Sequence, residues 1–237
     1  MKTLARPLAL ALAFGLAVLG ARGARAQTSP PSDAPAPAPA DGRQELIGRL
    51  ELGYRGSFVG SSGFDPFSDN DYLPQFSLEG SRTIFQRGAF SFAPGLALDV
   101  GGTSATARGD DTSLSMQRVE VPLEGRLHFG RWGYAFLRVA PGAAVLSAQV
   151  QDSNSPQPLT KSRWLYATDL SAGYSWLVWP GAKPWFWLQA EFGYGFVASE
   201  RLTLQPSTQT TPPVAGVDLG DLSLSGPFLR IAAAVSY

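Results

Sequence analysis

Apolar residues fall at every second position through most of the chain after Glu45. The pattern recurs in eight stretches, from "ELIGRLELGYRGSF" at 45–58 to "FLRIAAAVSY" at 228–237. A period of two is the side-chain period of a β-strand. No stretch in this part of the chain keeps a helical period over three turns. The sequence therefore predicts an all-β fold with eight strands.

The connections between these stretches alternate in length. The short ones are "QRG" near Gln86, "GRWG" near Gly130 and "PGAKP" near Pro180, and the long polar ones cover 60–71, 101–113, 151–162 and 199–225. Each stretch has about the 9–11 residues that a tilted membrane-spanning strand requires. The pattern predicts an eight-stranded antiparallel up-and-down transmembrane β-barrel with short periplasmic turns and long extracellular loops. We expect the last strand to pair with the first, near 46–58, because lipid does not tolerate an open sheet edge.

Alternation alone leaves open a soluble, lipocalin-like carrier with its polar face in water. The charged residues favour lipid instead. Lys161 and Lys183, the lysines of the chain beyond residue 26, both lie in predicted connections. The polar parity carries arginine, short acids and small residues, which suit a tightly filled interior. Its cations are Arg49, Arg55, Arg118, Arg126, Arg138 and Arg230, and its anions are Glu51, Glu79, Asp99, Glu120, Glu124, Asp169 and Glu191. Such a near balance is what a desolvated, paired network needs.

Aromatic residues gather toward both ends of the predicted strands. At or beside the short turns lie Trp132, Tyr134, Trp179, Trp185, Trp187 and Tyr237. Toward the long loops lie Tyr54, Phe58, Tyr72, Trp164, Tyr166, Tyr194 and Phe196. Two such belts are typical of the interfacial girdles of barrels in lipid.

The chain begins with a predicted secretory signal peptide at 1–26. Cations precede the apolar run "LALALAFGLAVLG", and "ARA" offers a small-x-small cleavage site before Gln27. A Pro/Ala-rich periplasmic linker is predicted at 27–44 and the barrel at 45–237. After cleavage 15 of the 19 basic residues remain against 19 acidic ones, which is not the balance of a nucleic-acid binder. The chain has no cysteine, so thiolate and disulfide chemistry are excluded.

The segment 45–237 resembles the small eight-stranded outer-membrane proteins of the OmpA and OmpX kind. The resemblance rests on strand count, loop asymmetry and Tyr237 with apolar residues at alternate positions before it. It implies a place in the outer membrane, among lipid and lipopolysaccharide. It also implies recognition of the terminal pattern by the barrel-assembly machinery, with Tyr where the family usually has Phe.

Four residues fit this prediction poorly. Pro94, Pro122 and Pro141 fall inside predicted strands, where each removes a ladder donor. We expect local bulges at the two "APG" segments, 93–95 and 140–142. Arg82 falls on the lipid parity, so we expect it to snorkel to the headgroups or the register to slip beside it.

Three sets of residues are candidates for a functional site. His128, the only histidine, would be a general base by resemblance to outer-membrane lipid A deacylases, but Gly130 stands where their His-x-Ser pattern has serine. A hydrogen-bonded lumen residue is therefore predicted. Glu120 and Glu124 would suit acid–base chemistry, and the lumen network is the preferred reading. Asp65, Asp69 and Asp71 would suit calcium, but the loop lacks the spacing of a calcium-binding hand.

No catalytic, cofactor-binding or metal-binding residue is predicted. The leading interpretation is a non-enzymatic barrel with a closed lumen that serves envelope integrity or surface interaction through its long loops. The segment 199–225 is the first candidate contact surface. The alternatives are a narrow small-solute channel, a lipid-modifying enzyme and the soluble carrier.

Overall fold

The computed structural model describes residues 48–107, 109–151, 158–181, 183–206 and 216–237. The predicted signal peptide and linker lie outside the described residues, as do parts of the predicted loops 151–162 and 199–225. The strands are β1 (Gly48–Phe58), β2 (Tyr72–Arg82), β3 (Phe85–Arg87), β4 (Phe90–Ala107), β5 (Asp110–Glu120), β6 (Leu123–His128), β7 (Gly133–Gln151), β8 (Leu159–Trp179), β9 (Trp185–Val197), β10 (Glu200–Pro206), β11 (Val217–Leu222) and β12 (Gly226–Ser236), and a short 3-10 helix, η1, covers Asp65–Phe67.

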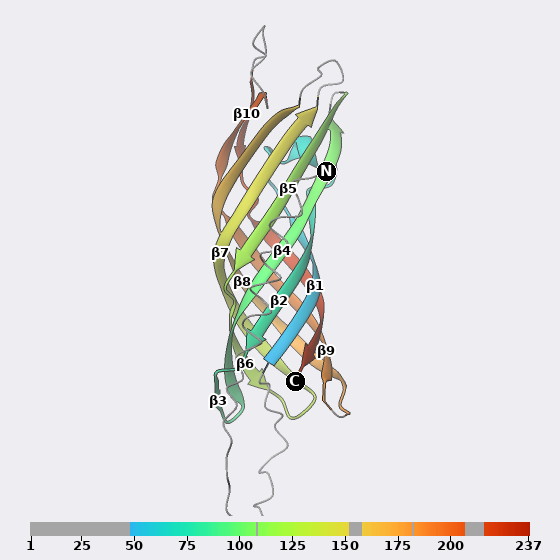
Figure 1. Cartoon of the computed structure of the whole chain (residues 1–237), viewed down its shortest axis with the longest axis vertical. Coiled ribbons are helices and arrows are strands. Elements are labelled where there is room, and N and C mark those ends of the chain that lie inside the picture. The colour runs from blue at the N-terminus through green and yellow to red at the C-terminus, as the bar shows by residue number, and fades with distance from the viewer. Residues whose placement is uncertain (1–47, 108, 152–157, 182, 207–215) are drawn as a thin grey trace, which may run out of the picture.

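Eight of these strands form one closed antiparallel ring, in the order β1, β2, β4, β5, β7, β8, β9 and β12 (Figure 1). The ring closes where β1 pairs with β12, from Arg49 opposite Ser236 to Ser57 opposite Phe228. The predicted pairing of the first and last strands is thus confirmed. Segment β6 continues the wall position of β5 beyond Pro122, because both pair with β4 and β7. Closure leaves no exposed edge within the ring.

The two faces of the wall differ as predicted. Large apolar side chains are exposed on the outside, among them Leu52 at 64%, Phe76 at 67% and Leu137 at 70%. The six arginines and seven carboxylates of the polar parity all lie inside and are buried. An apolar outer wall is the surface of a barrel in lipid, and a soluble carrier would show the opposite arrangement. Among the described residues, no helix is long and apolar enough to cross a membrane.

The strands are unequal in length, which corrects the predicted loop boundaries. β4, β7 and β8 have 18, 19 and 21 residues, about twice what a membrane crossing requires. The predicted loop 101–113 is therefore mostly the paired upper ends of β4 and β5. Lys161 lies in β8 rather than in a connection, and β10 and β11 form a hairpin within 199–225. β1 and β2 end after 11 residues each.

The prolines disturb the ladders less than expected. At Pro141 the pairing of β7 with β8 runs on without a shift, so the bulge expected at 140–142 is absent. Near Pro94 the register does slip, on the opposite strand. Ser81 pairs with Gly95 and Phe85 with Phe92, which leaves three residues (82–84) facing two. The slip therefore lies beside the exposed Arg82, as one of the two expectations had it.

Candidate functional site: a filled lumen and a crown of longer strands

Two layers of ion pairs fill the middle of the barrel. In the layer farther from the short turns, Asp169 of β8 accepts hydrogen bonds from Arg55 of β1 and from Arg118 of β5. Arg118 Nη2 lies 2.7 Å from Asp169 Oδ1. Glu120 pairs with Arg118 from the same strand, and Asp99 lies 3.7 Å from Arg55. Four strands, β1, β4, β5 and β8, are therefore tied together across the lumen.

The second layer is closer to the short turns and is built around Arg230 of β12. This side chain pairs with Glu51 and lies 3.0 Å from Glu79, and Arg138 of β7 lies 2.6 Å from the same Glu79 oxygen. Glu191 adds longer contacts of 3.6 and 3.7 Å to the two arginines. Sharing of each carboxylate between cations lowers the cost of burying them away from water.

These layers show where the predicted acid–base pair lies. Glu120 belongs to the first layer, and Glu124 accepts a 2.5 Å hydrogen bond from Arg126 Nε. The two carboxylates thus have arginine partners of their own and are buried at 2% and 3% exposure. Their geometry is that of the predicted lumen network.

An aromatic cluster, which we call the plug, lies inside the end of the barrel nearest the short turns. It consists of Tyr134, Phe136, Leu177, Trp185 and Trp187 with Ala234. Trp187 donates to Ser236 Oγ over 2.9 Å, and Arg49 lies over the rings of Tyr134 and Trp187, 5.6 and 6.0 Å from their centroids. A guanidinium over an aromatic face is attracted by the ring quadrupole.

This plug corrects the predicted girdle. Tyr134, Trp185 and Trp187 point inward with exposures of 9% or less, whereas Trp132, Trp179 and Tyr237 lie outside as predicted. The parity of the strands contained this information. Tyr134 shares its parity with Arg138, and Trp187 shares its parity with Glu191, so both rings had to face the lumen. Position near a strand end outweighed parity in the prediction.

His128 lies at the same end, where its Nε2 and Ser91 Oγ are 2.8 Å apart. Its ring also contacts Tyr134, with centroids 5.2 Å apart. Ser91 is 1% exposed inside the barrel wall. The predicted hydrogen bond of His128 is thus present. The serine is enclosed at the short-turn end of the barrel, and it does not stand in the His-x-Ser arrangement.

Beyond the membrane wall, the longer strands form a crown with an apolar interior. We define the crown as loop 60–71 with residues 101–107 of β4, 110–116 of β5, 146–151 of β7 and 159–163 of β8, together with β10 and β11. Its core contains the crown residues Phe64, Phe67, Leu114, Met116, Leu146, Leu202, Leu204 and Leu222, and it includes Val59, Leu73, Leu165, Val197 and Leu224 where the crown meets the rest of the barrel. The interior of the barrel therefore changes from charged to apolar along the same strands.

Loop 60–71 fills the gap that the short β1 and β2 leave in the crown. Phe64 and Phe67 are fully buried in the crown core. Thr112 of β5 donates to the carbonyl of Pro66, and the backbone N–H of Ser223 donates to Ser61 Oγ over 3.2 Å. The loop thus connects the two sides of the crown.

The three acids of this loop point away from its core. Asp65, Asp69 and Asp71 are exposed. Within the described part of the chain, no group of three or more histidines and acids is placed to hold a metal ion. Asp71 has a positive φ of 54° and its carbonyl accepts from the Val59 amide, which gives it a part in the turn.

The outer wall of the crown carries polar side chains in register. Each row crosses several strands: Ser104, Ser113, Gln149 and Thr160 form one row, and Ser115, Ser147 and Ser162 form the row below it. Above both, Asp111 pairs with Thr106 and Gln151. Below them, Gln117, Val145 and Trp164 form the row where the lipid-facing wall begins. We call the ten residues of the upper three rows the polar face.

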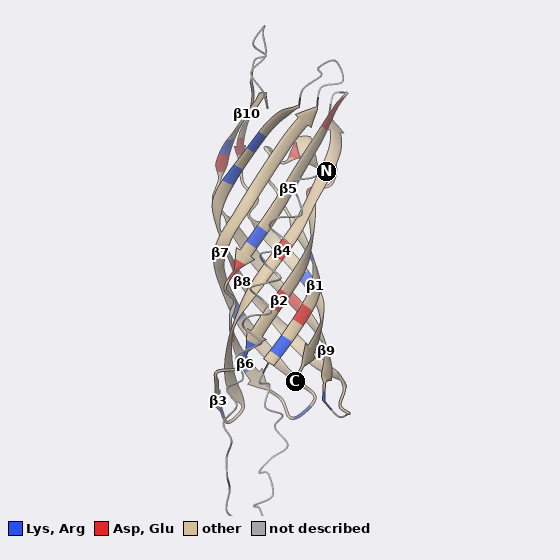
Figure 2. Cartoon of the chain, in the orientation of Figure 1, with Lys and Arg blue, Asp and Glu red and all other residues tan. Residues whose placement is uncertain are grey.

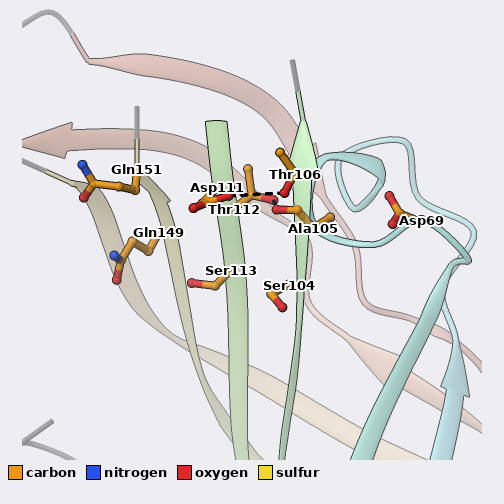
Figure 3. A pocket seen from close by; sticks show the side chains of 9 residues that line it. All are labelled: Asp69, Ser104, Ala105, Thr106, Asp111, Thr112, Ser113, Gln149 and Gln151. Atoms are coloured by element: carbon orange, nitrogen blue, oxygen red, sulfur yellow. Dashed lines mark hydrogen bonds between the residues drawn. The ribbon is translucent and has the colours of Figure 1, made fainter. Parts of the chain in front are cut away.

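An open hollow of about 500 Å³ lies at the upper edge of the polar face (Figure 3). Side chains from β4, β5 and β7 line it, and Asp69 reaches it from loop 60–71 on the far side of β4. Thr106 Oγ1 donates to Asp111 Oδ1 over 3.2 Å at its centre. Its lining offers hydroxyl, amide and carboxylate groups.

The neighbouring wall of the crown is charged instead. Lys161 of β8 lies 3.0 Å from Glu200, and Arg201 of β10 lies 2.6 Å from Asp218 of β11. Figure 2 shows these charges together on the upper parts of β8 and β10. Lys161 also donates to the backbone carbonyl of Arg201, and this contact joins β8 to the hairpin in addition to the ladder pairs of Gln205 with Thr160 and Pro206 with Leu159.

No family model matches the chain, and no curated protein matches it. The solved structures to which the chain is similar include the following three. Ail of Yersinia pestis, in complex with the heparin analogue sucrose octasulfate, has a TM-score of 0.46 and 12% identity over 80% of this chain and 97% of Ail. The outer membrane protease OmpT of Escherichia coli has a TM-score of 0.45 and 8% identity over 80% of this chain and 93% of OmpT. The β domain of the Bordetella autotransporter BrkA has a TM-score of 0.40 and 8% identity over 81% of this chain and 99% of the β domain.

With these scores, the three likenesses carry no argument about function. The class of the protein follows from its own geometry: a closed eight-stranded antiparallel ring with an apolar outer wall and a charged, filled interior is an outer-membrane type of β-barrel.

Proposed function

We propose that this protein is a non-enzymatic component of the outer membrane whose lumen is closed and whose crown is its interaction surface. The observation that carries the proposal is the change of the interior along the strands. Ion pairs and an aromatic plug fill the membrane part, and an apolar core makes the crown rigid. Eight strands leave an interior just wide enough for side chains, so no solute path is required to explain the architecture.

Planar-bilayer recordings test the closed lumen. The wild-type barrel is expected to give no steady conductance. A variant in which Glu79, Arg138 and Arg230 are all replaced by serine loses one layer of ion pairs but keeps the other layer and the plug, so it is also expected to give no steady conductance, and its altered gel mobility on heating would establish that it folds. A reproducible pore in the wild-type protein would overturn this part of the proposal in favour of a channel.

The absence of cysteine allows a direct test of the crown's place at the cell surface. Thr203→Cys on β10 is expected to react with a membrane-impermeant maleimide on intact cells. Gln86→Cys on β3, at the opposite end of the barrel, is the matched control and is expected to react only after the outer membrane is opened. Equal labelling of both variants on intact cells would contradict the proposed orientation.

The enzyme alternative has its own test. Labelled lipopolysaccharide and phospholipid are expected to remain unmodified by the purified barrel in lipid vesicles. Turnover that disappears with both Ser91→Ala and His128→Ala would show the hydrogen-bonded pair to be catalytic and would replace the non-enzymatic proposal.

A further inference from the structure

We infer that the polar face is a binding surface for the neutral sugar headgroups of glycolipids in the surrounding outer leaflet. The inference rests on the proposed function, because it requires the crown to stand outside the membrane. It names the chemistry that one wall of the crown would recognise.

The position of the polar face is the first step. Its lowest row follows directly on the row of Gln117, Val145 and Trp164, and Trp164 is 73% exposed at the head of the lipid-facing wall. Successive rows are two residues apart, about 6.6 Å along a strand. The polar face therefore occupies the first ~20 Å along the strands beyond the girdle. This is the level of the headgroups rather than of the acyl chains.

Its direction is the second step. The residues of the polar face alternate along β5 with Thr112, Leu114 and Met116, which are buried. The polar face thus belongs to the lateral wall of the barrel, as the apolar wall below it does. A lateral wall meets the molecules that surround the barrel in its own membrane, so we assign the glycolipid of the same leaflet as occupant.

Its chemistry is the third step. None of the ten residues carries a positive charge, and Asp111 is the single acid among them. Each hydroxyl both donates and accepts, and each glutamine amide does so through separate atoms. This surface offers no counter-ion to a phosphate or sulfate. Its closely spaced donors and acceptors match a polyol, and the hollow beside Asp111 and Asp69 adds carboxylates that accept strongly from hydroxyls.

The contrast with the adjoining wall supports this assignment. Lys161, Arg163 and Arg201 lie on β8 and β10 among Glu200 and Asp218. Those groups pair with one another, whereas in the polar face Ser147 Oγ donates to Ser162 Oγ over 3.1 Å. The uncharged character is therefore confined to one wall of the crown (Figure 2).

The test uses the full-length barrel in detergent, with digalactosyldiacylglycerol and a phosphatidylglycerol of the same acyl chains as probes. Native mass spectrometry counts the lipid that stays bound. The wild-type barrel is expected to retain the galactolipid in preference. The double variant Ser113→Ala, Gln149→Ala is expected to lose this preference by about five-fold or more, as the loss of two ordinary hydrogen bonds would produce.

The chain supplies a matched control. Ser62 in loop 60–71 and Thr203 on β10 are exposed polar residues of the crown outside the polar face, and the variant Ser62→Ala, Thr203→Ala is expected to behave as the wild type. The inference is overturned if the wild type shows no preference, or if the two double variants lose it equally. Either outcome leaves the proposed function standing, because that is tested separately by conductance and by surface labelling.

Discussion

Leu114 and Arg118 point into the same barrel from the same strand, four residues apart, yet one lies in an apolar core and the other in an ion-pair layer. Leu114 is 1% exposed in the crown core, and Arg118 is 1% exposed in the first layer of ion pairs. On the outside the order is reversed, with Ser113 and Ser115 above and Val119 below. The boundary between Met116 and Arg118 thus marks the level at which the surroundings of the barrel change from lipid to water.

Leu114→Ala is expected to loosen the crown without unfolding the membrane part. Truncation of a buried leucine leaves a cavity and costs about 2–5 kcal/mol. Because the crown core is separate from the ion-pair layers, the cost falls on the crown. Trypsin is expected to cleave at Arg163 and Arg201, which are exposed, several-fold faster on intact cells.

Leu170→Ala is the control for this prediction, since Leu170 is 56% exposed on the lipid-facing wall of β8 and its truncation leaves no internal cavity. Both variants should keep the heat-dependent gel mobility of the wild type. Equal protease sensitivity of the two would show that the crown has no separate core.

Glu79→Ala is expected to destabilise the whole barrel. Its carboxylate is shared by Arg138 and Arg230, at 2.6 and 3.0 Å, and all three are buried. Removal of one partner from a buried ion pair leaves an uncompensated charge and costs about 3–5 kcal/mol. Urea unfolding in lipid vesicles measures this loss in the free energy of unfolding.

Glu200→Ala removes a carboxylate that pairs with Lys161 over 3.0 Å near the surface of the crown. The side chains of Lys161 and Glu200 are 16% and 28% exposed, so solvent partly screens the pair and its loss should cost less than the loss of the fully buried Glu79 carboxylate. A Glu79 variant as stable as the Glu200 variant would mean that the lumen tolerates an unpaired arginine, and the filled-lumen argument would lose its energetic basis.

Ring closure and lumen charge were predictable because both follow from a short-range rule. Successive side chains of a strand point to opposite faces, so Arg49, Glu124 and Arg230 had to share one face once the strands were placed. Lipid, in turn, requires that the face opposite to them be apolar and that the first and last strands pair. These predictions needed no knowledge of the loops.

The crown was not predicted, because its strands reverse the rule that identified the others. In 101–113 the outward-facing residues Ser104, Thr106, Asp111 and Ser113 are small and polar, a composition that is also typical of loops. The signal that was missed is that Leu114 and Met116 keep the parity of Arg118 and Glu120. Continuity of parity across a change in polarity indicates a strand that leaves the membrane.

Gly53→Leu is expected to prevent the ring from closing properly. A Cβ at this position would lie 2.7 Å from Ser77 Oγ, 3.0 Å from Ala232 Cβ and 3.2 Å from the Ile231 carbonyl, which belong to the strands on both sides of β1. A larger side chain must therefore displace β2 or β12. Refolding into lipid vesicles, followed by gel mobility without heating, measures the folded fraction.

The control for this substitution is Gly80→Leu on β2, where an added Cβ meets nothing within 4 Å. Gly80 lies on the outer parity of the wall, so a leucine there faces lipid and folding should be unchanged. If the Gly53 variant refolds to the same extent as the Gly80 variant, the close approach of β12 to β1 is not needed for closure.

The β10–β11 hairpin is expected to loosen in acid. The hydrogen bond from Arg201 holds the pKa of the exposed Asp218 carboxyl below its usual value, and the Gly220 amide adds to this effect. A lowered pKa means that the ionised carboxylate stabilises the hairpin above the unfolded value, about 3.9. That contribution is lost as the pH falls through the folded pKa.

The Leu202 and Leu204 amides should therefore be protected from hydrogen exchange equally at pH 7 and 5, and their protection should fall below about pH 4. Because exchange chemistry itself depends on pH, the comparison is made as protection factors against Asp218→Asn. This variant lacks the titrating group and should show low protection at every pH. Retention of the acid-dependent loss in the asparagine variant would assign it to another carboxyl group of the crown.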